Sequence, residues 1–532
     1  MASSNLPDAF KQSYINSARY PLNMANTMPN TSPKLLEGLH ERLDEMSHKL
    51  FVDAEIDVEI PWRDLGVGFK HDLKKKNIHD SVKLAEMMNF NIDNTTMAVT
   101  LSQYDPQCRF IYISGETSLS VLDITRPMFA RILTFHQVMP AYLDFVMAFG
   151  RQDEPKDLRF SSFKKQVSLA PSARLPEMVD LGRSGQQYQL CYNLKHVSRE
   201  KEGGFSMIRQ AAIHHQFDVV TGKTLWLVTS GRRSLQERYK DLTGKEAKAQ
   251  NKSFKSPLEC LQSSLAAHLM FSSWSSENWR WYIKSLENNL EEATGLTVHG
   301  PRGLGEYHQK YKPGDLQTLQ RHEDMVHETI AALEANFRVT RSLHNFYTGL
   351  KNNKDFPLRH DGAEYIDVFA DQLEDFLSDI EHLVQRAETL LKITNGRKEL
   401  VIQHYQGQST ENMEKMNSNM EKETILVRIV TIVTLVYLPA TFVSTFFSTD
   451  VIKYQNGQND SGSFSYTAMV RWLQVALPLT ALTLFLAWLW NRWAKRQLIR
   501  GRDEAHQLSI WSFRRMQSPP LLPQYNEKTV CN

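Results

Sequence analysis

Two long apolar segments near the C-terminal end constrain this chain more than any other feature. The first covers 425–447 and contains one charged residue, Arg428, while the second covers 472–490 and contains none. As helices they measure about 34 Å and about 28 Å, and the hydrocarbon core of a bilayer is about 30 Å thick. The two segments therefore predict a transmembrane hairpin, in which 448–471 forms the extracytosolic loop.

The positions of basic residues predict how this hairpin is oriented. The loop contains only Lys453 and Arg471 as basic residues. The tail that follows, 491–532, begins with a basic cluster: Arg492, Lys495, Arg496, Arg500 and Arg502. Since Lys and Arg are enriched in cytosolic flanks of membrane helices, we expect a multi-pass protein with both termini in the cytosol.

The N-terminal residues bear on the choice of membrane. Residues 1–33 are polar and rich in Pro, Asn and Ser, and we expect them to be disordered. They contain a single arginine, Arg19, whereas mitochondrial presequences are Arg-rich and amphipathic. The plasma membrane or another endomembrane is therefore favoured over a mitochondrial one.

Residues 34–300 predict a cytosolic domain of mixed α and β structure. Short apolar or alternating runs predict strands at 54–60, 97–101, 109–114, 118–123, 188–195, 207–217 and 225–228. The apolar stretch 127–149 is interrupted by charges and Pro140, so it predicts two buried helices. A linker is expected at 234–256, and a helix capped by Ser275 and Ser276 thereafter.

A helical stalk is predicted for 315–424, leading into the first membrane helix. Its second half carries apolar residues at alternating steps of four and three, which is typical of a coiled coil. The members of this seam are Phe369, Leu373, Phe376, Ile380, Leu383, Ala387 and Leu390.

Hydroxyl side chains share one face of the first apolar segment. Their spacings of seven, four and three residues place them on one side of a helix: Thr434, Thr441, Thr445 and Ser448. Polar groups at membrane depth need partners, so this face should contact protein or water. The pattern alone leaves two explanations open, namely helix packing through small residues and the lining of a pore made by several copies.

The segment 425–450 resembles the first transmembrane helix of CorA-type magnesium channels, with Leu438-Pro439-Ala440-Thr441-Phe442 in its centre. The stretches 133–150 and 275–287 resemble a fungal CorA-like group. The resemblance implies a funnel-shaped homopentamer that conducts a divalent cation, Mg²⁺ first, without enzymatic activity or a cofactor. Its pore would be lined by Val427, Val430, Thr434, Leu438, Thr441, Thr445 and Ser448, with Val430 and Leu438 as the gate.

The sequence departs from this family at the outer end of the helix. The family signature is Gly-Met-Asn, and this chain has Ser448-Thr449-Asp450. Asp450 would place a ring of carboxylates at the pore mouth, which attracts cations. We therefore predict that Asp450, Ser448, Thr445 and Thr441 contact the metal. The alternative is a non-conducting scaffold or sensor on the same architecture.

Three further features give weaker hypotheses. The acidic side of the stalk between Asp361 and Glu388 is either a solvated face or, as the resemblance implies, a cation-sensing surface. Asn459 in the predicted loop begins an Asn-Asp-Ser glycosylation motif. The tail residues Leu522, Pro523 and Tyr525 form a weak match to a WW-domain ligand.

Other classes of function receive no support from the sequence. The net charge of +2 does not favour nucleic-acid binding, and the four cysteines are too widely spaced for a zinc site. His322 and His327 are five residues apart, so they do not form the HExxH metal motif. The adjacent His214 and His215 are expected on opposite faces of a strand, in structural roles.

Overall fold

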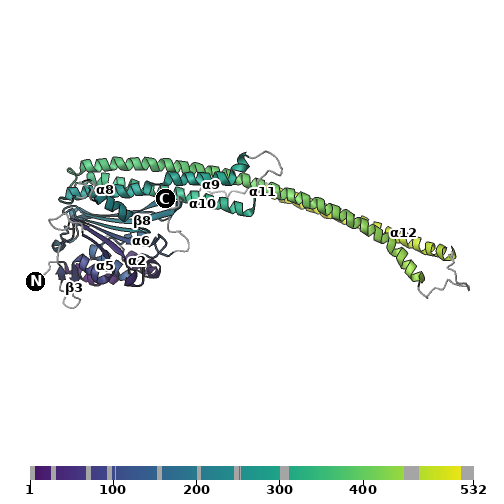
Figure 1. Cartoon of the computed structure of the whole chain (residues 1–532), viewed down its shortest axis with the longest axis horizontal. Coiled ribbons are helices and arrows are strands. Elements are labelled where there is room, and N and C mark those ends of the chain that lie inside the picture. The colour runs from purple at the N-terminus through teal and green to yellow at the C-terminus, as the bar shows by residue number, and fades with distance from the viewer. Residues whose placement is uncertain are drawn as a thin grey trace, which may run out of the picture. The chain divides into compact units, whose positions relative to one another are not determined.

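A seven-stranded sheet organises the N-terminal part of the chain, in the order β2-β1-β5-β9-β8-β7-β6 (Figure 1). The β5–β9 pair is parallel and the other neighbouring pairs are antiparallel. The strands are β1 (Ile60–Leu65), β2 (Lys74–Ile78), β5 (Cys108–Ser114), β6 (Phe163–Ser168), β7 (Gln187–Arg199), β8 (Phe205–Asp218) and β9 (Thr224–Ser230), and β3 (Phe90–Ile92) pairs separately with β4 (Val99–Leu101). Every residue of β5 and β9 is buried, as expected for central strands covered on both faces.

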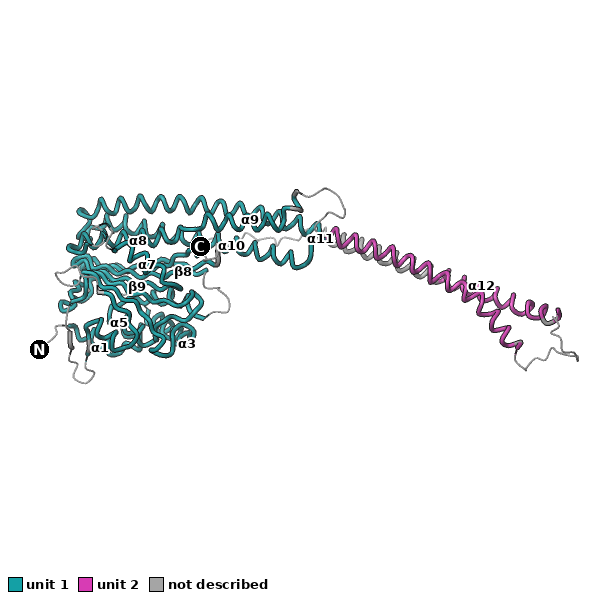
Figure 2. Tube along the Cα trace, viewed as in Figure 1, with its two compact units in different colours: residues 1–405 teal, residues 406–532 magenta. Residues whose placement is uncertain are grey.

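The computed structural model describes residues 6–25, 32–66, 74–92, 99–101, 104–151, 159–199, 205–244, 248, 251, 253–299, 311–448 and 466–516. Its helices are α1 (Asp8–Ile15), α2 (Pro33–Glu45), α3 (Ser47–Leu50), α4 (Ser81–Met88), α5 (Arg126–His136), α6 (Tyr142–Val146), α7 (Ser234–Thr243), α8 (Pro257–Ser276), α9 (Trp279–His299), α10 (Pro313–Lys351), α11 (Ala363–Ser448) and α12 (Tyr466–Met516). Two compact units result, residues 1–405 and 406–532 (Figure 2).

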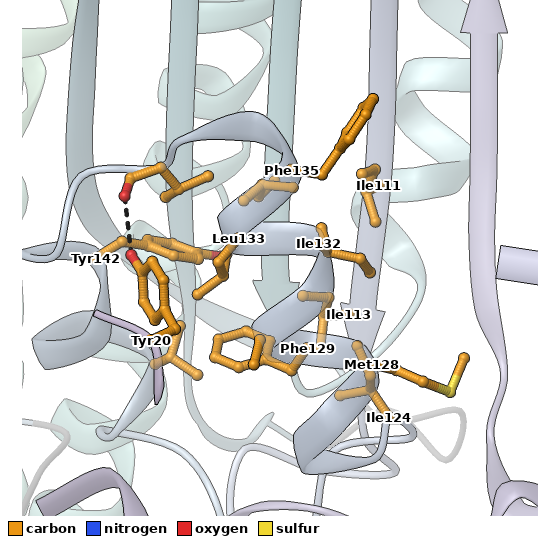
Figure 3. Packing of buried hydrophobic residues seen from close by; sticks show 14 of the residues in the cluster. Tyr20, Ile111, Ile113, Ile124, Met128, Phe129, Ile132, Leu133, Phe135 and Tyr142 are labelled. Carbon is orange, nitrogen blue, oxygen red and sulfur yellow. Dashed lines mark hydrogen bonds between the residues drawn. The ribbon is translucent and has the colours of Figure 1, made fainter. Parts of the chain in front are cut away.

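Helices cover both faces of the large sheet. On one face, Ile111 and Ile113 of β5 pack against α5 residues that include Phe129 and Ile132 (Figure 3). On the other face lie α8 and α10 (Figure 1), and aromatic residues such as Phe110 and Trp226 are buried in one cluster with residues of α7, α8 and α10. Successive side chains of β5 thus pack on opposite faces of the sheet, and helices cover both faces. The prediction of a mixed α+β domain is confirmed.

The prediction that residues 1–33 are disordered is wrong for 6–25. Helix α1 buries Phe10 completely, and the Tyr20 hydroxyl donates a hydrogen bond to the Val138 carbonyl at 2.8 Å (Figure 3). The Phe10 ring packs against Phe90 of β3 and Phe135 of α5, and Val138 follows α5, so these partners are all distant in the sequence. No local pattern in a polar segment could therefore have shown that it is part of the core.

Four local predictions also need correction. At 54–60 the chain forms a 3₁₀ turn over Glu55–Asp57, with Ile56 91 % exposed, and β1 begins only at Ile60. The expected linker at 234–256 contains α7, which buries Leu235 and Tyr239 against the sheet. Ser275 and Ser276 end α8 instead of capping the next helix. The segment 118–123 forms no strand beyond a single bridge from Leu122 to Phe51.

Helix α10 belongs to the folded domain, although it was expected to start the stalk. Strand β6 does not extend along β7 as far as Lys195, so the backbone of Lys195 lacks a partner strand there. The Asn336 side chain of α10 takes that place, accepting from the Lys195 N–H at 2.8 Å and donating to its carbonyl at 2.7 Å. The α11 seam residues Ile380, Ala387 and Leu390 are buried in one cluster with α9 and α10.

Candidate ion pathway

Two helices are long and apolar enough to cross a membrane. The most apolar windows of 363–446 and 469–493 have mean hydropathies of 2.0 and 1.7 and are almost entirely exposed. They contain the predicted segments 425–447 and 472–490. Because exposed apolar surface of this extent is unfavourable in water, these side chains require lipid or protein neighbours.

One face of α11 packs against α12 within the second unit. Val443 and Ala476 are 3 % and 4 % exposed, and Pro439 is also buried on this side. The Trp472 indole Nε1 donates a hydrogen bond to the Ser444 hydroxyl at 3.0 Å. These contacts define the seam of the hairpin and therefore the orientation of the rest of α11.

The predicted pore-lining residues lie on the opposite side of α11 from this seam. Thr441 follows Pro439 by two residues, a rotation of about 200° at 3.6 residues per turn. Val427, Val430 and Leu438 are 62–65 % exposed. The whole set is exposed, and we call it the α11 stripe: Val427, Val430, Thr434, Leu438, Thr441, Thr445 and Ser448.

The hydroxyl groups of the stripe are oriented by the helix itself. Thr434, Thr441 and Thr445 donate to the carbonyl oxygens four residues earlier at 2.7, 3.0 and 2.9 Å. Their protons are therefore used within the helix, and each oxygen presents free lone pairs outward. Water bound to a divalent cation donates hydrogen bonds outward, so such oxygens suit a hydrated cation.

Several predicted site residues fall outside the part of the chain that is described. These are Asp450 with its neighbour Thr449, the glycosylation candidate Asn459, and the tail residues Leu522, Pro523 and Tyr525. The proposed carboxylate ring therefore stays a prediction, as do the glycosylation site and the WW-domain ligand.

The acidic side of α11 is exposed and partly paired. Glu374 accepts from Arg341 at 2.9 Å, and Asp367 forms an ion pair with Lys351 at 2.6 Å. Among the described residues, no group of three or more His, Cys, Asp or Glu side chains is arranged to hold a metal ion. A cation-sensing role of this surface stays a hypothesis.

The buried histidines have structural roles. His214 contacts Cys191 at 3.2 Å on one side of the sheet, while His215 contacts His268 at 3.1 Å on the other. Burial lowers the pKa of both His214 and His268 to about 3, which keeps these rings neutral. His322 is bonded to the Leu286 carbonyl at 2.9 Å.

The model of the CorA-like transporters matches residues 12–298, more than half of the chain. The chain belongs to the CorA-like transporter family. The match covers the sheet domain, and the two apolar helices follow it in sequence. With two such helices, this member of the family is a membrane protein of a divalent-cation transporter family. The family consists of transporters and not of enzymes.

Several solved structures show distant similarity to this chain. The complete CorA magnesium transporter from Methanocaldococcus jannaschii is 12 % identical, with 81 % of this chain and 97 % of that chain covered at a TM-score of 0.32. The full-length CmaX protein is 12 % identical, with 83 % and 99 % covered at a TM-score of 0.30. The soluble domain of the Methanocaldococcus jannaschii CorA is 11 % identical, with 65 % and 96 % covered at 0.34. No curated protein matches the sequence of this chain.

Proposed function

We propose that this CorA-like protein forms a homopentameric channel for divalent cations, with Mg²⁺ as the first candidate, lined by the α11 stripe. The observation that carries the proposal is the position of the stripe opposite the α12 seam. In the described part of the chain these residues are exposed, and the threonine hydroxyl oxygens among them present lone pairs outward. Several copies placed around an axis would surround a hydrated cation with acceptors.

The apolar residues of the stripe and the acidic residue Asp450 that follows it have different roles in this proposal. Val430 and Leu438 narrow the pathway and gate it by excluding water. Asp450 supplies a carboxylate ring at the outer mouth that raises the local cation concentration. Both termini lie in the cytosol, and the membrane is the plasma membrane or another endomembrane.

Flux into liposomes tests the proposal directly. Purified full-length protein is inserted into liposomes, and uptake of Mg²⁺ and Zn²⁺ is followed with entrapped indicators, alongside Asp450→Ala. We expect uptake of Mg²⁺ that falls in the variant. Absence of flux for both metals, with insertion verified by protease accessibility, would contradict the proposal and favour the alternative of a non-conducting scaffold or sensor.

A further inference from the structure

A cavity of about 900 Å³ lies in the sheet domain, far in sequence from the α11 stripe. Strands β1, β2 and β5 form one wall and α7 forms the other. Its volume is in the range of sites for drug-sized ligands. Four cationic side chains line it, together with the carboxylates of Glu237 and Asp241: Arg63, Lys75, Arg233 and Lys240.

The pairing of β1 with β2 places two of these cationic side chains next to each other. Arg63 and Lys75 are directly opposite each other in the antiparallel β1–β2 pair, so their side chains are on the same face. Like charges in this position repel and destabilise the pair. The neighbours of Arg63 on β5 at this face are Phe110 and Tyr112, which offer no carboxylate. An anion bound between Arg63 and Lys75 would remove this repulsion.

Unused hydrogen-bond donors near Arg63 also favour an anionic ligand. In its hydrogen bonds to described residues the Arg63 guanidinium uses only Nη1, which donates to the carbonyls of Trp62 and Lys76 at 2.8 and 3.3 Å and to Asn77 Oδ1 at 3.4 Å. Lys75 and Lys240 form no ion pair within the described part of the chain. Arg233 is already paired with Glu59 at 2.5 Å.

Tyr112 supplies an independent observation. Its side chain lines the cavity and is 4 % exposed, and its buried hydroxyl has no hydrogen-bond partner among the described residues. Burial raises the pKa of Tyr112 well above its ordinary value, so the hydroxyl keeps its proton as a donor. A buried hydroxyl without a partner is costly, and a bound acceptor would satisfy it.

We infer that this cavity binds a small phosphorylated anion, held by Arg63, Lys75 and the Tyr112 hydroxyl. Phosphoryl oxygens are multiple charged acceptors and match guanidinium and ammonium donors. The volume admits a nucleotide as well as pyrophosphate. The inference concerns a site in the sheet domain and does not depend on whether the chain conducts.

Calorimetric titration of the full-length protein in nanodiscs of neutral lipid tests this inference. We expect ATP or pyrophosphate to bind with a Kd below about 1 mM. Lys75→Ala and Arg63→Gln should each weaken binding about tenfold, since charge-assisted hydrogen bonds are lost. Tyr112→Phe should weaken anion binding less while preserving the fold, because the hydroxyl has no partner among the described residues to lose.

Lys76→Ala is the matched control. Lys76 is the next residue of β2, on the opposite face, where it pairs with Glu86 at 3.0 Å. The Lys76→Ala variant removes the same charge as Lys75→Ala and should leave anion binding unchanged.

Nanodiscs that carry a phosphoinositide form a further arm of the experiment. If the protein binds these nanodiscs in a manner that depends on Lys75 and competes with ATP, a lipid headgroup is the source of the phosphate. No binding in any arm, or equal weakening by Lys76→Ala, overturns the inference.

Discussion

The indole N–H of Trp472 in α12 donates to the Ser444 hydroxyl of α11 at 3.0 Å. Ser444 is one residue from Thr445, yet the two side chains are about 100° apart around the helix. The bond therefore holds one polar side chain of α11 on the hairpin seam and leaves its neighbour in the α11 stripe. A single interaction between the two helices thus contributes to fixing which face of α11 is available to other copies of the chain.

Replacing Ser444 with Ala should destabilise the hairpin modestly. Interhelical hydrogen bonds in membranes contribute about 0.6 kcal/mol on average, so the thermal midpoint of the solubilised protein should fall slightly. Trp472→Phe should have a similar effect and add little in the double variant, because both remove the same bond. The control is Trp490→Phe at a side chain that is 72 % exposed. Full additivity of the two seam variants would contradict the expected coupling.

Leu438→Ala should increase basal cation flux several-fold. A smaller side chain at an apolar constriction makes the pathway easier to wet, and the open fraction rises. Flux is measured in the liposome assay without an added activator. Leu482→Ala is the matched control, since Leu482 is a 53 % exposed leucine on α12. Equal flux through the wild type and Leu438→Ala would show that Leu438 is not part of the gate.

Asn336→Ala should destabilise the sheet domain strongly. The change leaves the N–H and the carbonyl of Lys195 buried without partners, at a cost of about 2–4 kcal/mol for the two groups. Thermal unfolding followed by circular dichroism measures the effect. Asn345→Ala on the exposed side of α10 should be nearly neutral. A small effect of Asn336→Ala would show that water replaces the lost amide.

Asp123 should make the stability of the domain depend on pH. Burial raises the pKa of Asp123 to about 6. Arg233 opposes this rise, while Glu59, Asp57 and Glu116 add to it. Because the folded pKa lies above the unfolded one, the folded state binds the proton more tightly. The associated stability is present below about pH 4 and is lost as pH rises through 6.

Asp123→Asn should remove this dependence. The variant should be more stable than the wild type at pH 7, by less than about 1 kcal/mol because the half-exposed site is screened by solvent. Unfolding midpoints measured between pH 4 and pH 7 give the comparison. An unchanged slope in Asp123→Asn would assign the pH dependence to other groups.

The sequence by itself determined the features that depend on neighbours close along the chain. Apolar runs long enough for a bilayer identified both membrane helices, and a three- and four-residue spacing placed the hydroxyls on one face of α11. The resemblance centred on Leu438 and Thr441 led to the family that the match over 12–298 shows. These inferences succeeded because helix periodicity and bilayer thickness act over short stretches of chain.

Only the tertiary structure decided what depends on residues distant in sequence. Phe10 packs against Phe90 and Phe135, Tyr20 bonds to Val138, and α7 buries Leu235 and Tyr239 in the sheet domain. Asp64 and Arg109 form a buried bidentate ion pair at 2.9 and 3.0 Å across adjacent strands. The opposition of Arg63 and Lys75 likewise follows from strand register. Long-range packing and register set these relationships, and no local pattern in the sequence encodes them.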